Sequence, residues 1–281
     1  MEIKTKLYKG EHEVKFLGPT EDKPNRHMYY VDGKRKTGVT TYIGIVDKSR
    51  PLIFWATELY RDFLLENLKA IDEELVYRGC ELHSEKKEDA AAIGDEAHRW
   101  IEKYLKGDSP DMPERKEAQI AVNSFLEWSE KENLKFVSVE RVVYSKKHDY
   151  IGTFDIEAKK GNKRYLIDIK TSNGIYNTYY MQTAAYVKAD EEESGKKYDG
   201  RYIVRLAKET EKEYNERIEK KNKSREMKGK DRWDYGPYQP FEVMFLDEDK
   251  KNIDRDFKGF LHAKALYEWN KETDPFLNKK K

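Results

Sequence analysis

The chain has 281 residues, of which 37% are hydrophobic and 39% are charged, so it is more polar than an average globular domain. A net charge of +1 excludes a global basic field, so binding to nucleic acid must come from a local patch. The single cysteine, Cys80, excludes an internal disulfide and an iron–sulfur cluster built by this chain alone. We expect a cytoplasmic protein that is neither secreted nor membrane-bound, because residues 1–15 contain no apolar run and no stretch approaches the roughly 20 apolar residues of a membrane span.

Short strands are expected in residues 1–50, over Lys4–Val46. Within them, Tyr29-Tyr30-Val31 precedes Asp32-Gly33, a pair that favours the tight turn of a β-hairpin.

A helical region is expected over residues 51–132, because apolar residues there recur at helical spacing. Pro51 opens it, and Gly79 lies near the end of its first helix. The predicted helices are Leu52–Val76, Asp89–Leu105 and Arg115–Lys131.

Residues 133–206 are expected to form the core, and residues 241–281 a closing strand and helix. The predicted strands are Phe136–Tyr144, Tyr150–Ala158, Tyr165–Ile169, Tyr202–Leu206 and Phe241–Leu246, and the predicted helices are Tyr176–Val187 and Ile253–Asn270. This order predicts an α/β (α+β) fold, in which helices flank a mixed central sheet in one domain spanning residues 1–281.

Residues 207–240 are expected to project from the sheet as an insertion. Lys208–Arg225 is a charge run with helical propensity, and Lys228–Pro240 is rich in glycine, proline and aromatic residues. The insertion is either a solvated helix and loop or an arm that contacts DNA, since its lysines and arginines are mixed with Trp233, Tyr235 and Tyr238.

Two carboxylates and one ammonium lie at the ends of two apolar strands. Asp168 and Lys170 are two residues apart, so their side chains leave the same face of a strand. An antiparallel turn through Lys160-Gly161-Asn162-Lys163 would bring Asp155 beside that face. Two carboxylates and a backbone carbonyl, here that of Ile169, form a hard-oxygen site suited to Mg²⁺ or Mn²⁺. Lys170 would then position or activate a water molecule, or offset charge on a phosphate.

The same pattern also arises from surface ion pairs in a chain this rich in lysine and acids. Its apolar flanks, Leu166, Ile167 and Ile169, favour the functional interpretation, because burying these charges is costly unless a metal or substrate compensates.

Three further features lie before or after Asp168 and Lys170 in the sequence. Gln182 and Tyr186 share a face of the next helix, where they could hold a phosphate or simply form a polar stripe. His98 lies on an earlier helix, four residues after Gly94, and by itself is more often structural. Glu140 either faces the same site, as a further candidate metal ligand, or forms surface ion pairs.

Taken in order, these residues resemble the RecB-type branch of the PD-(D/E)XK nucleases. The resemblance rests on Gly94-x-x-x-His98, Glu140, Gly152-Thr153-x-Asp155, Asp168-Ile169-Lys170-Thr171 and Gln182-x-x-x-Tyr186. Upstream, Gly38-Val39-Thr40-Thr41, Asp47-Lys48-Ser49, Pro51-Leu52 and Trp55 resemble the segment that opens the mitochondrial genome maintenance exonucleases and some phage and bacterial relatives.

The resemblance implies a PD-(D/E)XK core with the site at one edge of the sheet. It implies that His98, Asp155, Asp168 and the Ile169 carbonyl bind Mg²⁺ or Mn²⁺. It further implies that Lys170 is catalytic and that Gln182 and Tyr186 support the site and contact DNA. Relatives with an iron–sulfur cluster carry four cysteines, which this chain lacks.

The sequence therefore predicts a metal-dependent deoxyribonuclease, an exonuclease on single-stranded DNA ends. Repair, replication and phage recombination would all suit this chemistry. Candidate DNA contacts are Lys48, Arg50, Trp55, Thr171 and Tyr186, joined by Phe54, Tyr60 and Arg61 along the first long helix. Phe54 and Trp55 have an alternative interpretation as core residues. The alternatives for function are a structure-specific or duplex endonuclease of the same fold and a catalytically silent DNA-binding or assembly module. An unrelated transferase or α+β enzyme is the weakest alternative, because the chain has no glycine-rich phosphate loop after a strand and no G-x-S-x-G elbow.

Overall fold

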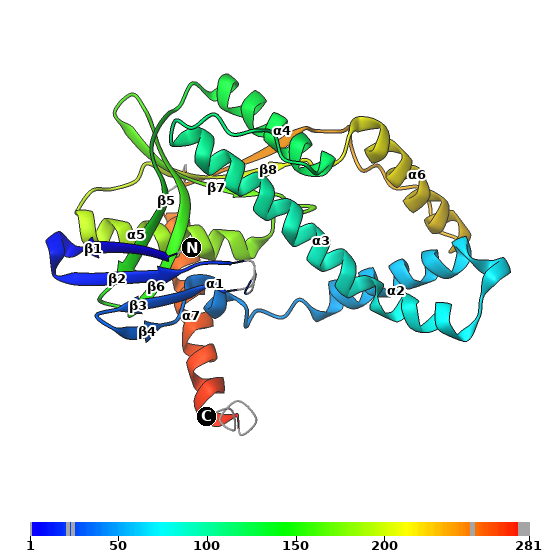
Figure 1. Ribbon diagram of the computed structural model, residues 1–281, viewed down its shortest axis with the longest axis horizontal. Coiled ribbons are helices and arrows are strands. Elements are labelled where there is room, and N and C mark those ends of the chain that lie inside the picture. The colour runs from blue at the N-terminus through cyan, green and yellow to red at the C-terminus, as the bar shows by residue number, and fades with distance from the viewer. Residues whose placement is uncertain (1, 21–22, 24–25, 248–250, 275–281) are drawn as a thin grey trace.

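The computed structural model describes residues 2–20, 23, 26–247 and 251–274, and it contains two β-sheets with helices around the larger one (Figure 1). The smaller sheet is antiparallel and comes from the start of the chain. Its strands, in spatial order, are β1 (Glu2–Leu7), β2 (His12–Leu17), β3 (Met28–Val31) and β4 (Lys34–Lys36).

The larger sheet carries the residues singled out by their chemistry. Its five strands follow in chain order, as β5 (Lys135–Ser145), β6 (Tyr150–Lys160), β7 (Lys163–Lys170), β8 (Gly200–Leu206) and β9 (Phe241–Leu246). Only β7 and β8 pair in parallel, and helix α5 (Asn177–Ser194) supplies the crossover that parallel pairing needs. The predicted mixed sheet flanked by helices is confirmed at this level.

Helices cover both faces of the five-stranded sheet. On one face, α3 (Glu73–Leu105) and α4 (Lys116–Glu132) bury Trp100, Phe125 and Trp128 with the side chains of Ile167 and Ile169. On the other, α1 (Val39–Ile43), α5 and α7 (Lys251–Thr273) pack around Phe154 and Leu166. Strand β7 is thus apolar on both sides, as expected for a buried strand.

The N-terminal strands are confirmed up to residue 36, and the β3–β4 hairpin turns at Asp32-Gly33, both with positive φ (49° and 76°). The prediction of strands as far as Val46 is wrong, because Val39–Ile43 form helix α1. The reason is tertiary, since Val39, Tyr42 and Ile43 bury their side chains in the core against α5 and α7.

The predicted end of a helix at Leu105 is confirmed, but the predicted break between Val76 and Asp89 is wrong. Helix α2 covers Ser49–Glu66, and a short 3₁₀ turn (Leu68–Ala70) joins it to α3, which runs unbroken from Glu73. The Asp72 side chain accepts a hydrogen bond from the amide of Leu75 and so caps α3. Gly79 does not end a helix. A Cβ there would lie 2.6 Å from the ring of Tyr60, so glycine permits the close packing of α2 on α3.

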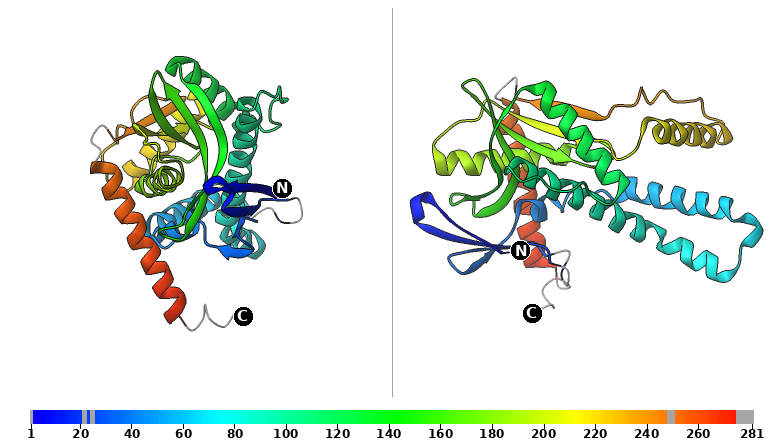
Figure 2. Two further views of the ribbon diagram at one scale, coloured as in Figure 1. Left: turned by 90° about the vertical axis from the view of Figure 1, so that its left-hand side faces the viewer. Right: turned by 45° about the horizontal axis from the view of Figure 1, so that its top comes forward.

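The charged insertion forms helix α6 (Glu211–Met227), followed by residues 228–240 without helix or strand. Helices α2 and α6, with the first half of α3, extend away from the sheets on the same side (Figures 1 and 2). We call α2, α6 and this half of α3 the arm. Within the described residues, no helix combines the length and apolar character needed to span a membrane.

Candidate metal centre

The site lies where β6 and β7 separate. The two strands pair antiparallel from Lys160 and Lys163 as far as Ile156 and Ile167, as the sequence predicted, with Gly161 in the turn at a φ of 61°. Asp155 and Asp168 come directly beyond the last pair. Asp155 Oδ2 accepts a hydrogen bond of 2.7 Å from the backbone amide of Ile169, which fixes this carboxylate beside β7.

Three side chains from three elements converge here. His98 of α3, Glu140 of β5 and Asp155 of β6 each offer a ligand atom, and these atoms lie within 4.8 Å of one another. His98 Nδ1 is 3.9 Å from Asp155 Oδ2. One imidazole and two carboxylates could hold a divalent cation, although this donor set does not distinguish Mg²⁺ from Mn²⁺.

The backbone of Glu140 is strained to reach this position. Its φ is +53° inside a strand, although the neighbours Val139 and Arg141 pair regularly with Ile156 and Phe154 of β6. A non-glycine residue in the left-handed region costs about 1–3 kcal/mol and persists where its surroundings demand it. From the sequence, Glu140 could either face the site or form ion pairs on the surface. The structure places it at the site.

Asp168 and Lys170 form the second half of the site. Lys170 Nζ lies 2.6 Å from Asp168 Oδ2, and Asp168 is only 1% exposed. Among the described residues, Asp168 Oδ1 has no hydrogen-bond partner. A buried carboxylate oxygen without a donor is costly, and a bound cation would satisfy it. Asp168 is outside the three-residue group, so its role as a ligand, and that of the Ile169 carbonyl, stay predictions.

The electrostatics of the site favour a cation. Burial, followed by repulsion from Asp155, raises the pKa of Glu140 well above its ordinary range. Burial also raises the pKa of Asp155, and it raises that of Asp168 to about 6 although Lys170 opposes the shift. Burial and then Lys170 lower the pKa of His98 to about 4, which keeps its imidazole neutral and able to bind a metal. A divalent ion would stabilise all three ionised carboxylates.

Two glycines let the helices approach the site. A Cβ on Gly94 of α3 would lie 2.8 Å from Thr171 Oγ1, so glycine brings this turn of α3 against the end of β7 and His98 follows one turn later. A Cβ on Gly152 would meet the ring of Tyr186 on α5. Close packing therefore explains the glycine that begins each of these two sequence patterns, Gly94 and Gly152.

Gln182 and Tyr186 share a face of α5, as predicted, and Gln182 Nε2 donates to the Tyr186 hydroxyl at 3.0 Å. Tyr186 is only 3% exposed. The ring packs against Gly152 of β6, and a contact of Tyr186 with DNA stays a prediction. Its observed contacts fit a supporting role.

Sequence reasoning missed two tyrosines near the site. The ring of Tyr179 on α5 lies 4.8 Å from Lys170 Nζ, measured to its centroid. Tyr29 of the small sheet shares a 3.1 Å hydrogen bond with Thr153, two residues before Asp155. The sequence could have indicated Tyr179, because it lies three residues before Gln182. No local sequence signal indicates Tyr29.

The predicted DNA contacts on α2 lie on an open surface. Lys48 and Arg50 are exposed, and none of the residues of α2 is buried. The alternative interpretation of Phe54 and Trp55 as core residues is wrong, because both are exposed. Thr171 is half-buried beside Lys170.

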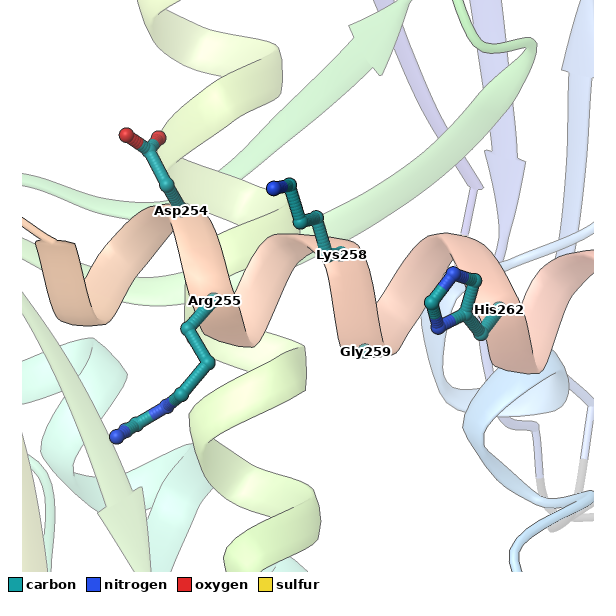
Figure 3. A pocket seen from close by; sticks show the side chains of 5 residues that line it. All are labelled: Asp254, Arg255, Lys258, Gly259 and His262. Carbon is teal, nitrogen blue, oxygen red and sulfur yellow. The ribbon is translucent and has the colours of Figure 1, made fainter.

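A surface hollow of about 540 Å³ lies elsewhere, along α7 (Figure 3). Its side chains, Asp254, Arg255, Lys258 and His262, point in different directions and do not converge on a centre. The separated strands β6 and β7 therefore remain the best candidate site.

No protein-family model and no curated protein matches the sequence. The residues of the candidate site and their geometry are therefore the basis for inferring its function.

Proposed function

We propose that this chain is a divalent-metal-dependent deoxyribonuclease with a PD-(D/E)XK-type core, acting as an exonuclease on single-stranded DNA. One observation carries the proposal. Three acidic side chains, a neutral histidine and a lysine gather, half-buried or buried, at the end of two strands, and one buried carboxylate oxygen there lacks a donor among the described residues.

The donor set suits a hard divalent cation held by His98, Glu140 and Asp155, with Asp168 as the further ligand that its unpaired oxygen supports. When bound, the ion supplies Lewis-acid activation of a phosphate and lowers the pKa of a bound water.

Lys170 has a separate role in the proposal. Its ammonium pairs with Asp168 and faces the ring of Tyr179, so it is held at the edge of the ligand group. From this position it would orient the attacking water or offset the charge that develops on the scissile phosphate. Asp155, fixed by the Ile169 amide, keeps its second oxygen for the cation.

The proposed preference for single-stranded DNA rests on the side chains exposed around α2 and beside Lys170. Lys48, at the N-cap of α2, and Arg50 and Trp55 on α2 combine charge with an exposed aromatic ring, and Thr171 directly follows the catalytic lysine. Such mixtures bind single strands through phosphate contacts and stacking with little sequence preference.

The first test uses single-stranded and duplex DNA labelled at the 5′ or 3′ end, with Mg²⁺, Mn²⁺ or EDTA. We expect metal-dependent loss of the single strand, and the order of label release gives the polarity. Asp168→Ala and Lys170→Ala should each reduce the rate at least about 100-fold, as expected when a group that stabilises the transition state is removed. Nuclease activity that survives either substitution would contradict the proposal.

A matched control is available on the opposite side of α5. Lys188 and Asp254 form an ion pair of similar length, 2.7 Å, outside the candidate site. Lys188→Ala and Asp254→Ala should leave the rate unchanged. Circular single-stranded DNA separates the alternatives, since an end-dependent enzyme leaves it whole and an endonuclease opens it. Binding without cleavage in any metal would instead support a silent binding module.

Metal binding has its own readout. A ligand that binds only the folded state raises its stability, so Mg²⁺ or Mn²⁺ should raise the unfolding temperature of the wild type. Asp155→Asn should abolish that rise, whereas Asp254→Asn should keep it.

A further inference from the structure

The segment that follows the catalytic lysine, Thr171–Tyr176, leads into the first turn of α5. It lies at the carboxyl end of β7, where the parallel strand β8 also ends, and this edge of a sheet commonly binds ligands. Ser172 Oγ donates to the carbonyl of Gly174 at 2.8 Å, which braces the turn. The start of α5 is thus held beside Lys170.

Two tyrosine rings pack against each other beside Lys170. Tyr179 faces the ammonium of Lys170 at 4.8 Å, and Tyr176 stands edge-on to Tyr179, with ring centroids 5.6 Å apart and planes at 70°. Tyr176 is 49% exposed. About half of Tyr176 is therefore accessible to a flat partner, while Tyr179 lies between it and Lys170.

The position of Tyr176 is unusual for its residue type. It is the N-cap residue of α5, where serine, threonine, asparagine or aspartate normally caps the helix. No side chain caps this helix, and its first turn carries no acidic residue. The amide of Tyr179 donates to the Tyr176 carbonyl at 2.9 Å, which fixes Tyr176 at the start of α5, and the positive end of the helix dipole lies next to Lys170.

We propose that Tyr176 is the stacking residue for an unpaired nucleobase of the strand that Lys170 acts on. The inference rests on the proposed function and deepens it, because it names the ligand as an unpaired nucleotide. A base inside a duplex presents no free face to the ring, so Tyr176 selects single-stranded DNA or a frayed end.

The decisive experiment measures binding and cleavage separately. Affinity for a fluorescein-labelled oligothymidine is measured by anisotropy in EDTA, where cleavage does not interfere. Tyr176→Ala should weaken binding about 5- to 150-fold, the range that loss of one stacked base corresponds to. Tyr176→Phe and Tyr176→Trp should bind like the wild type, because stacking needs the ring and not the hydroxyl. In Mg²⁺, Tyr176→Ala should raise KM by a similar factor with little change in kcat.

An abasic scan identifies the base that stacks. A single abasic nucleotide is moved along the oligonucleotide, and one position should weaken wild-type binding as much as Tyr176→Ala does. At that position the two losses should not add, since both remove the same contact. Tyr104→Ala is the matched control, because Tyr104 is a comparably exposed tyrosine (43%) near the end of α3, outside the arm, and its loss should leave the scan unchanged.

The outcomes separate this inference from the nuclease proposal. Tyr176→Ala that binds like the wild type, a Phe variant as weak as the Ala variant, or additive losses at every abasic position would overturn the stacking role. A protein that shows the Tyr176-dependent coupling but cleaves nothing in any metal would retain the stacking site and refute the nuclease. Unchanged unfolding temperatures of the Tyr176 variants confirm that the fold is intact.

Discussion

The five-stranded sheet and the arm contain the same kinds of charged residue in opposite surroundings. Within the sheet, Arg201 of β8 is fully buried and pairs with Asp247 and Asp256 at 2.6–2.8 Å. In the arm, Lys220 of α6 pairs with Glu66 of α2 at a similar 2.8 Å, but both side chains are largely exposed.

The difference lies in desolvation rather than distance. Breaking a buried pair leaves charges without water, so the sheet's ion pairs fix their side chains in one arrangement. An exposed pair returns to water at little cost. The candidate site is built in the first setting, where Asp168 and Lys170 are held in place, and the arm is built in the second, where paired side chains remain in contact with solvent.

The largest effect on stability is expected from Arg201→Ala. It leaves the buried carboxylate of Asp247 without its arginine and Asp256 with Arg255 alone, which should lower the free energy of unfolding by about 3–5 kcal/mol. Urea denaturation measures the loss. Lys220→Ala in the arm should change it by less than about 1 kcal/mol. Equal losses in the two variants would show that burial does not distinguish the two regions.

The second effect concerns pH and the metal site. Burial raises the folded-state pKa of Asp168 to about 6 from 3.8, so its protonated form contributes stability that is complete below pH 3.8 and is lost as pH rises through 6. In EDTA, the free energy of unfolding of the wild type should therefore fall relative to Asp168→Asn between pH 4 and pH 7, by about 1–3 kcal/mol. Mg²⁺ should reduce the fall. Parallel pH profiles for the two proteins would contradict the assignment.

A smaller effect comes from removing one methyl group in each region. Ile203→Val on β8, where the side chain is fully buried, should cost about 0.5–1.5 kcal/mol. Ile53 on α2 is 61% exposed, so Ile53→Val should be neutral within about 0.5 kcal/mol. Thermal unfolding of both variants tests this pair. A measurable loss at Ile53 would mean that the exposed face of α2 is covered in solution.

The smallest effect is expected from salt on the arm. Exposed pairs join α6 to α2, namely Lys220 with Asp62 and Glu66 and Lys228 with Glu58. Raising NaCl to about 1 M screens them, so amide exchange of α6 should speed up by no more than about fivefold while α5 stays unchanged. Unchanged exchange in α6 would show that contacts other than charge hold it to α2.

The sequence by itself determined what depends on near neighbours. Strand alternation placed Asp168 and Lys170 on one face, the turn residues set the β6–β7 and β3–β4 hairpins, and the four-residue spacing brought Gln182 to Tyr186. Each follows from backbone periodicity or turn chemistry, which a short segment encodes completely.

Only the tertiary structure decided what depends on distant contacts. The close packing of α3 on α2 depends on the fit of Gly79 against the ring of Tyr60. His98 and Glu140 meet Asp155 because α3 and the strained strand β5 pack there, and Tyr186 is buried because α5 lies against Gly152. Such contacts join residues tens of positions apart, so their geometry is set by how whole elements fill the core and not by local pattern.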